Sequence, residues 1–472
     1  MQAYNPYLPS WEYIPDGEPH VYGDRLYVYG SHDRFRGHVY CLNDYVCWSA
    51  PVDDLADWRY EGVIYKKTDD PDNPDGEGCL FAPDVTQGPD GRYYLYYVLH
   101  NRNYVSVAVC DTPAGKYEYL GNVRYPDGTR LGEREGDEPQ FDPGVLTEGD
   151  VTWLYTGFCG PWDDSRHGPM VTRLGQDMLT ITQPPRFILP SKPYAGETEY
   201  AKHAFFEAPS IRRFNGIYYF VYSSIVMHEL CYATSDRPDE GFAYRGVLVS
   251  NCDLHIDSYK PADKPMLYCA NNHGGLAEVK GHYYIFYHRH TNGTNFSRQA
   301  MAEPIRMLPD GGFQQAEMTS CGLNGGPLIG RGTYPAHIAC NLFTSVDHMY
   351  TGGPGGDGFW LDARFPILTQ DGRDGDEEPG YIFNMTESAT CGFKYFRFEG
   401  LRRITVYTRG YGNGYFGVKT AWDGEELGRI PVHGGTNWQA TAGEASIPDG
   451  VHALYLTYHG GGNIALLKFT LE

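Results

Sequence analysis

GIYYFVYSS, residues 216–224, is the stretch that decides the fold, because four other segments of the chain repeat its pattern. In each copy a glycine turn leads into a strand in which Tyr or Trp alternates with aliphatic residues. A period of two is typical of a β-strand with one buried face, and Gly beside Asp or Asn is typical of a tight hairpin turn. The other copies are GDRLYVYGS from Gly23, GRYYLYY from Gly91, GDVTWLYTG from Gly149 and GHYYIFYHR from Gly281.

The five copies recur about every 65 residues, and no helical pattern separates them. Regularly spaced strand-turn units of this kind predict a five-bladed β-propeller over residues 1–305. The segment before each hairpin turn is then the inner strand of a blade, which lines the central channel of the propeller.

The repeat ends near residue 305. Residues 306–325 have the composition of a loop-like linker, and residues 326–472 contain short strands separated by turns rich in Gly, Asp and Asn. Such a pattern fits an antiparallel, jelly-roll-like β-sandwich. We therefore predict an all-β chain in which a five-bladed propeller is followed by a β-sandwich.

Acidic residues precede the hairpin turns at similar spacing. Asp16, Asp84 and Asp142 each lie seven residues before the turn glycine, Glu207 lies nine before it, and His273 lies eight before it. One such Asp could simply cap a turn. Four acids in register around one axis repel one another, and this cost favours a role in chemistry or in binding a cation.

Composition limits the function further. The formal net charge of −22 argues against nucleic acid, and aromatic residues at 15% of the chain offer flat faces on which sugar rings stack. We see no secretory signal and no stretch of about 20 apolar residues that could span a membrane. The 11 cysteines show no zinc-binding spacing, so we expect them to stay reduced in a cytoplasmic protein.

The motifs around these residues resemble those of glycoside hydrolase family 43, whose catalytic domain is a five-bladed propeller. The matching segments are PDGEPHVYGDRLYVYGSHD with Asp16, FDPGVLTEGD with Asp142, FFEAPSIRRFNGIYYF with Glu207, NNHGG with His273 and YHRHTNGTNFSRQ with Arg298. Paired carboxylates are also what glycoside hydrolysis requires.

The resemblance implies an inverting mechanism. Asp16 would be the general base that activates water, Glu207 the general acid, and Asp142 the residue that orients Glu207 and adjusts its pKa. Glu18 lies two residues from Asp16 on the same strand face, and only the alignment to Gly23 sets it aside as the base.

The resemblance also implies that Arg298 reaches the substrate subsite. It assigns no proton transfer to Asp84, which we expect as a substrate or structural contact. Phe35 and Phe158 are candidate rings for stacking on sugar. His273 is either a hydrogen-bonding residue or, as the resemblance implies, a residue that faces a hydrated cation in the channel. Calcium is the expected cation, in a structural role.

The resemblance implies an exo-acting glycosidase that removes terminal pentoses from xylo- and arabino-oligosaccharides in xylan degradation: a β-xylosidase, an α-L-arabinofuranosidase, or both. The alternatives are an endo-acting arabinanase and a non-catalytic sugar-binding propeller. The C-terminal segment around Trp438 resembles carbohydrate-binding module family 6, so the sandwich either binds sugar or buttresses the propeller. The sequence indicates no oligomeric state.

Overall fold

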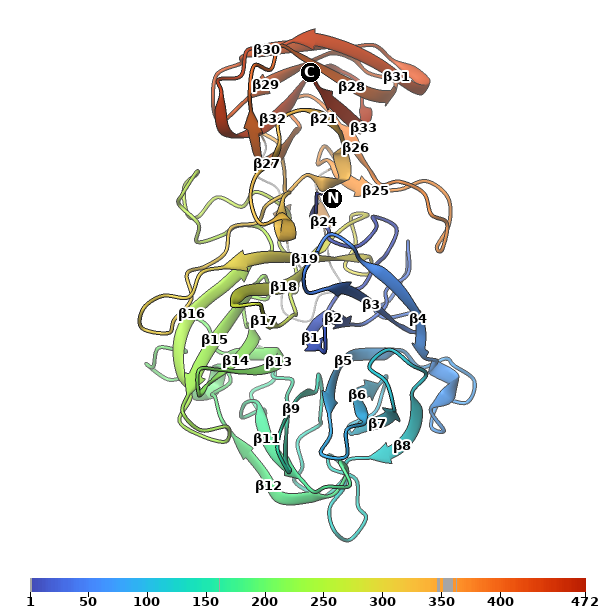
Figure 1. The fold of residues 1–472 in the computed structure, drawn as a ribbon, viewed down its shortest axis with the longest axis vertical. Coiled ribbons are helices and arrows are strands. Elements are labelled where there is room, and N and C mark those ends of the chain that lie inside the picture. Colours follow the sequence, from blue (N-terminus) through green and yellow to red (C-terminus); the bar gives the residue numbers. More distant parts are fainter. Residues whose placement is uncertain (1, 161, 346–348, 351–359, 362) are drawn as a thin grey trace.

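The computed structural model describes residues 2–160, 162–345, 349–350, 360–361 and 363–472. Five antiparallel sheets surround a central channel, and a pair of six-stranded sheets stands beside them as a second domain (Figure 1). The prediction of an all-β chain with a five-bladed propeller and a following β-sandwich is confirmed.

The blades follow one another along the chain, and four of the five have four strands. Blade 1 contains β1 (Glu18–Tyr22), β2 (Arg25–Tyr29), β3 (Tyr45–Pro51) and β4 (Arg59–Tyr65). Blade 2 contains β5 (Leu80–Gln87), β6 (Tyr93–Leu99), β7 (Val105–Cys110) and β8 (Glu118–Asn122). Blade 3 contains β9 (Gly144–Glu148), β10 (Val151–Thr156), β11 (Met170–Leu174) and β12 (Ile181–Phe187). Blade 4 contains β13 (Phe205–Phe214), β14 (Ile217–Ser224), β15 (Glu229–Ser235) and β16 (Ala243–Ser250), and blade 5 contains β17 (Leu276–Val279), β18 (His282–His290) and β19 (Arg298–Ile305).

The repeated glycines sit in the turn between the first and second strand of each blade. All five adopt positive φ, from 59° at Gly149 to 85° at Gly216, a region that side chains disfavour. The first strand of each blade contacts the first strands of both neighbouring blades, so that β1, β5, β9, β13 and β17 form a closed ring. These strands are therefore the channel-lining strands that the repeat predicts.

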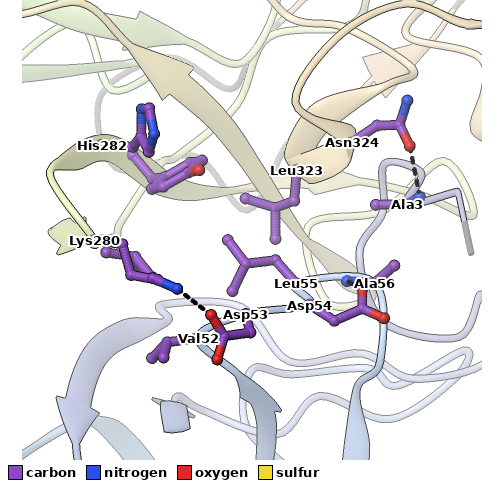
Figure 2. A pocket seen from close by; sticks show the side chains of 12 residues that line it. Ala3, Val52, Asp53, Asp54, Leu55, Ala56, Lys280, His282, Leu323 and Asn324 are labelled. Atoms are coloured by element: carbon purple, nitrogen blue, oxygen red, sulfur yellow. Dashed lines mark hydrogen bonds and ion pairs between the residues drawn. The ribbon is translucent and has the colours of Figure 1, made fainter. Parts of the chain in front are cut away.

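Blade 5 meets blade 1 without sharing a sheet. A bridge pairs Gly17 with Gly274 near the channel, and Lys280 forms an ion pair with Asp53 across a groove of about 390 Å³ (Figure 2). The N-terminal segment seals the same seam, because the buried side chain of Asn5 donates hydrogen bonds to Ala302 O, Glu303 Oε1 and Thr319 O.

The second domain packs two sheets face to face. One has the order β20 (Leu328–Ile329), β27 (Thr390–Phe398), β32 (Gly450–Gly461), β29 (Asn413–Lys419) and β30 (Gly428–Val432), with β22 (Asn341–Phe343) on β27. The other has the order β25 (Ile367–Thr369), β26 (Tyr381–Met385), β33 (Ile464–Leu471), β28 (Arg403–Gly410) and β31 (Gly435–Glu444), with β21 (Gly332–Pro335) on β33. A separate pair joins β23 (Met349–Tyr350) to β24 (Trp360–Leu361). The four 3-10 turns among the described residues are η1 (Lys67–Asp69), η2 (Lys192–Tyr194), η3 (Gly322–Asn324) and η4 (Ala336–Ile338).

The two domains share one hydrophobic core. It runs from Phe214 in blade 4 and Met301 in blade 5 to Phe469 in the sandwich. The connecting segment 306–325 packs along blade 4, where Ala316 pairs with Val249. Trp438 lies under the guanidinium of Arg409, 4.3 Å from its ring centroid, so this ring packs within the sandwich.

The structure corrects one expectation about the cysteines. Cys252 and Cys269 form a disulfide, with Cα atoms 5.1 Å apart, across the loop between β16 and β17. Nine other cysteines are free, as predicted. Among the described residues, no helix has the length and apolar character needed to cross a membrane.

A buried ion cluster fixes the junction between the domains. Lys394 Nζ on β27 lies 2.8 Å from Asp253 Oδ2 and 2.9 Å from Glu317 Oε1, and both Lys394 and Asp253 have no exposed surface. Removal of one partner from a buried pair leaves the other charge uncompensated in a medium of low polarity.

We expect Lys394→Met to lower the free energy of unfolding by about 3–5 kcal/mol because Asp253 loses its cation. The control is Lys468→Met, since that lysine lies over the Tyr407 ring near the surface and its loss should cost less than about 1 kcal/mol. Urea unfolding of the three proteins checks this. Addition of Asp253→Asn to Lys394→Met should restore part of the loss, and equal midpoints for all variants would contradict the role assigned to the cluster.

Candidate active site

The functional side chains leave the inner strands where the regular strand geometry breaks. Asp16 and Asp142 each lie two residues before an inner strand, at φ of 58° and 47°. Glu207 lies within β13 at a bulge, where the pairing register shifts and the next residue, Ala208, has φ of 66°. Bulges and left-handed residues re-aim side chains, which directs these carboxyls into the channel.

Asp16 is held by a buried guanidinium. Arg298 Nη1 donates to Asp16 Oδ1 at 2.9 Å, while Nε and Nη2 of Arg298 donate to the two oxygens of Asp33 at 2.8 and 3.0 Å. Burial alone would raise the pKa of Asp16, but the charge of Arg298 outweighs it and holds this pKa well below its usual range. Asp16 is therefore an ionised carboxylate that can accept a proton.

Glu207 has the opposite electrostatic environment. Its side chain is only partly buried, and among the described residues its carboxyl makes no hydrogen bond or ion pair. Burial and the negative charge of Asp16 together raise the pKa of Glu207 to about 8. Glu207 therefore carries a proton at neutral pH and keeps an accessible face from which to donate it.

Asp142 is a third carboxyl that interacts with these two. Its Oδ2 accepts a hydrogen bond from the backbone N–H of Ala208 at 3.2 Å, which ties it to the residue after Glu207. Burial, with the charges of Glu207 and Asp16, raises the pKa of Asp142 well above its usual range. Asp142 and Glu207 thus compete for protons in one site, as expected if Asp142 adjusts the acid.

His273 is surrounded by three carboxyl groups but lies beyond hydrogen-bond distance of each. Its Nδ1 is 4.0 Å from Asp16 Oδ1 and 3.8 Å from Asp142 Oδ2, and its Nε2 is 3.9 Å from Glu18 Oε1. Burial lowers the pKa of His273 to about 4, so the ring is neutral at pH 7. Glu18 Oε1, on the Nε2 side of the ring, is buried without a hydrogen-bond partner.

The other oxygen of Glu18 has partners that sequence reasoning missed. Arg212 Nη2 and Ser210 Oγ donate to Glu18 Oε2 at 2.6 and 2.9 Å. Arg212 Nη2 also lies 3.3 Å from His20 Nε2, so a guanidinium already occupies the space among Glu18, His20 and Asp84, three potential metal ligands. The alternation of Ser210 and Arg212 on β13 was the available signal, since both fall on one face of the inner strand.

Asp84 joins blades. It is fully buried, its Oδ1 lies 2.6 Å from His20 Nε2 of blade 1, and its Oδ2 accepts the N–H of Val145 of blade 3 at 2.8 Å. Burial alone would raise the pKa of Asp84, but His20 and the other donors lower it. Of the two roles predicted for Asp84, the structural contact fits this geometry and a direct substrate contact does not.

The predicted ring-stacking residues differ in access. Phe35 is buried and stacks on Tyr13 with ring centroids 6.0 Å apart, which leaves little surface for a sugar. Phe158 is half-buried and contacts Phe206, next to Glu207, and the exposed Trp162. The three donor nitrogens of Arg298 face Asp16 and Asp33, so its contact with substrate stays a prediction.

Comparisons with known proteins agree with this geometry. Residues 12–313 match the family described as glycosyl hydrolases family 43. A protein named xylosidase/arabinosidase from Thermoclostridium stercorarium is 64% identical over 470 residues, covering 100% of this chain and 99% of its own length.

Two solved structures are similar in fold. A family 43 enzyme from Xanthomonas citri, solved with xylose, has 25% identity and a TM-score of 0.53 over 68% of this chain and 95% of its own. An arabinoxylan arabinofuranohydrolase from Bacillus subtilis, with 18% identity and a TM-score of 0.54, covers 99% of this chain and 97% of its own. The second likeness extends the shared fold over both domains.

We expect Asp16→Asn to lower the pKa of Glu207 from its value of about 8, because the negative charge that helps to raise it is removed. Infrared difference titration of protein labelled with ¹³C-glutamate measures this proton directly, without requiring activity. Asp24→Asn is the control, since that aspartate is exposed at a hairpin turn. An unchanged titration in Asp16→Asn would show that burial alone sets the pKa of Glu207.

Proposed function

Because this chain belongs to glycosyl hydrolases family 43, we propose that it is an exo-acting glycosidase that releases terminal β-D-xylose and α-L-arabinofuranose from xylo- and arabino-oligosaccharides. The chain is a glycoside hydrolase, and the identity of 64% to a xylosidase/arabinosidase over its whole length supports both sugars as substrates. The two pentoses present similar hydroxyl arrangements, so one pocket can accept both.

The observation that carries this proposal is the difference in protonation between two carboxyls of one site: one is ionised and the other carries a proton. Asp16, whose pKa is held low by Arg298, takes a proton from water as it attacks the anomeric carbon. Glu207, whose pKa is raised to about 8, gives its proton to the leaving oxygen. Asp142 positions Glu207 through Ala208. A single displacement of this kind inverts the anomeric configuration.

We infer that a hydrated calcium ion lies beside His273. The fit rests on the chemistry of the ring: His273 is neutral and distant from three carboxylates, and Glu18 Oε1 is buried without a partner. Calcium prefers oxygen ligands, so His273 would bind it through water. Burial raises the pKa of Asp142 and of Glu18, and the charge of the ion would favour their ionised forms beside Asp16.

A cytoplasmic location is the proposal that the sequence supports. A cytoplasmic enzyme would act on short imported oligosaccharides. The disulfide between Cys252 and Cys269 weighs against this location, because disulfides are rare in the reducing cytosol.

We expect Glu207→Ala to lower kcat/KM on xylobiose by about 10²–10⁴-fold, because the sugar alkoxide cannot leave without a proton. Hydrolysis of p-nitrophenyl β-D-xyloside and α-L-arabinofuranoside should fall much less, since nitrophenolate leaves unprotonated. Both rates are measured by product release. Glu197→Ala, which removes an exposed glutamate, should match the wild type on all three substrates.

Three results would contradict the proposal. Equal losses on xylobiose and the nitrophenyl substrates would exclude Glu207 as the acid. Retained configuration in the first product, read by ¹H NMR, would exclude the single displacement. A wild-type protein that ignores both pentosides and cleaves linear arabinan internally would be an endo-acting arabinanase.

The calcium proposal has its own test. Dialysis against EGTA should lower the Tm of the wild type, and calcium in zinc-free buffer should restore it, because the ion stabilises the ionised carboxylates. In His273→Ala the Tm should no longer respond to calcium. A wild-type Tm that is the same with EGTA and with calcium would overturn this assignment.

A further inference from the structure

A second group of metal-binding side chains lies in blade 4, outside the carboxylate ring. It consists of His203, just before β13, and Glu229 and Cys231, the first and third residues of β15. The period of two places Glu229 and Cys231 on the same face of β15, and His203 approaches that face from the preceding segment. None of the three takes part in the proposed hydrolysis.

Their ligand atoms already lie close to the spacing of a tetrahedral site. Cys231 Sγ is 3.3 Å from Glu229 Oε1 and 3.8 Å from His203 Nδ1. Zinc bonds of about 2.0–2.3 Å to N, O and S place neighbouring ligand atoms about 3.3–3.7 Å apart. The third distance, 2.5 Å between His203 Nδ1 and Glu229 Oε1, is that of a hydrogen bond whose proton a metal ion would replace.

Burial of the Glu229 carboxylate costs free energy unless its oxygens have hydrogen-bond or ionic partners. Its side chain has no exposed surface, and its Oε2 has no hydrogen-bond partner. The side chain of His255 lies beside that oxygen, with Nε2 3.5 Å away, and is half exposed. The buried Oε2 therefore has room for a closer partner than the protein itself supplies.

The site also has access to solvent. The side chain of His203 is 24% exposed, and its ring stacks on Tyr244 with centroids 5.2 Å apart, which fixes its plane. Ser224 Oγ donates to Glu229 Oε1 at 2.6 Å and so holds the carboxylate in place. An ion can therefore enter from the His203 side and keep water as its fourth ligand.

We propose that His203 Nδ1, Glu229 and Cys231 Sγ form a zinc-binding site in blade 4, with His255 orienting the carboxylate from its other oxygen. Binding releases two protons to solvent: one from the bond between His203 and Glu229, and one from the thiol of Cys231, which becomes a thiolate. The ion links β15 to the segment that leads into β13, four residues before Glu207.

Cobalt(II) is the probe, since it occupies zinc sites and absorbs visible light. The full-length protein should bind one equivalent of cobalt with the strong absorption of a four-coordinate site and with a thiolate-to-cobalt charge-transfer band. Zinc should displace the cobalt and abolish both. Cys231→Ser should lose the charge-transfer band, and His203→Ala should lose binding at concentrations that saturate the wild type.

Matched variants separate this site from others. His167→Ala removes a histidine that lies 2.6 Å from Glu138 but belongs to neither group of three potential metal ligands among the described residues, and it should bind cobalt like the wild type. His273→Ala should also keep the charge-transfer band, because that residue belongs to the channel. His255→Ala should weaken binding about 10–100-fold, as loss of an orienting partner does.

The proposal is overturned if the wild type binds no cobalt or zinc at neutral pH. It is equally overturned if Cys231→Ser keeps the charge-transfer band, or if His203→Ala and His167→Ala bind alike. Circular dichroism of each variant shows whether a loss of binding reflects loss of the fold.

Discussion

The charge of one buried guanidinium organises the whole channel. Arg298, from the last strand of blade 5, binds Asp16 and Asp33 of blade 1, and it is 2% exposed. In a medium of low polarity this pair keeps Asp16 ionised. The negative charge of Asp16 then helps to raise the pKa of Glu207 in blade 4. One ion pair across the seam between the first and last blades thus decides which carboxyl accepts a proton and which one donates it.

The propeller makes this arrangement possible because it repeats one junction five times. Each blade brings the start of its inner strand to the same end of the channel, where Asp16, Asp142 and Glu207 leave the sheet at left-handed residues or at a bulge. The negative charges of the other acids in the channel are compensated by neighbouring protein groups. Glu18 binds Arg212, and Asp84 binds His20 and a backbone amide of the next blade, so the scaffold uses some carboxylates to hold blades together and leaves others for chemistry.

The fold and the acids were predictable because their signals are local. A turn glycine, an alternating strand and an acid at fixed spacing lie within one segment, and five copies reinforce one another. What could not be predicted depends on pairing across the chain. The guanidinium of Arg298 lies against Asp16, the sulfurs of Cys252 and Cys269 form a bond, and Asp84 is closed off by His20. No spacing in the sequence shows which protein group an inward-facing side chain contacts, so the sequence left two roles open for Asp84, whose partners are His20 and a backbone amide.

The seal made by Asn5 has a consequence for synthesis of the chain. Its partners lie at Ala302, Glu303 and Thr319, so this segment is synthesised about 300 residues before its partners and is among the last to find its place. At about 5–20 residues per second, blade 1 waits on the order of 15–60 s for the partners of its leading segment. During that time the edge that later meets blade 5 is open to other strands. The nascent propeller is therefore an open ring until blade 5 is made. The speed of translation sets how long the edge of blade 1 stays exposed.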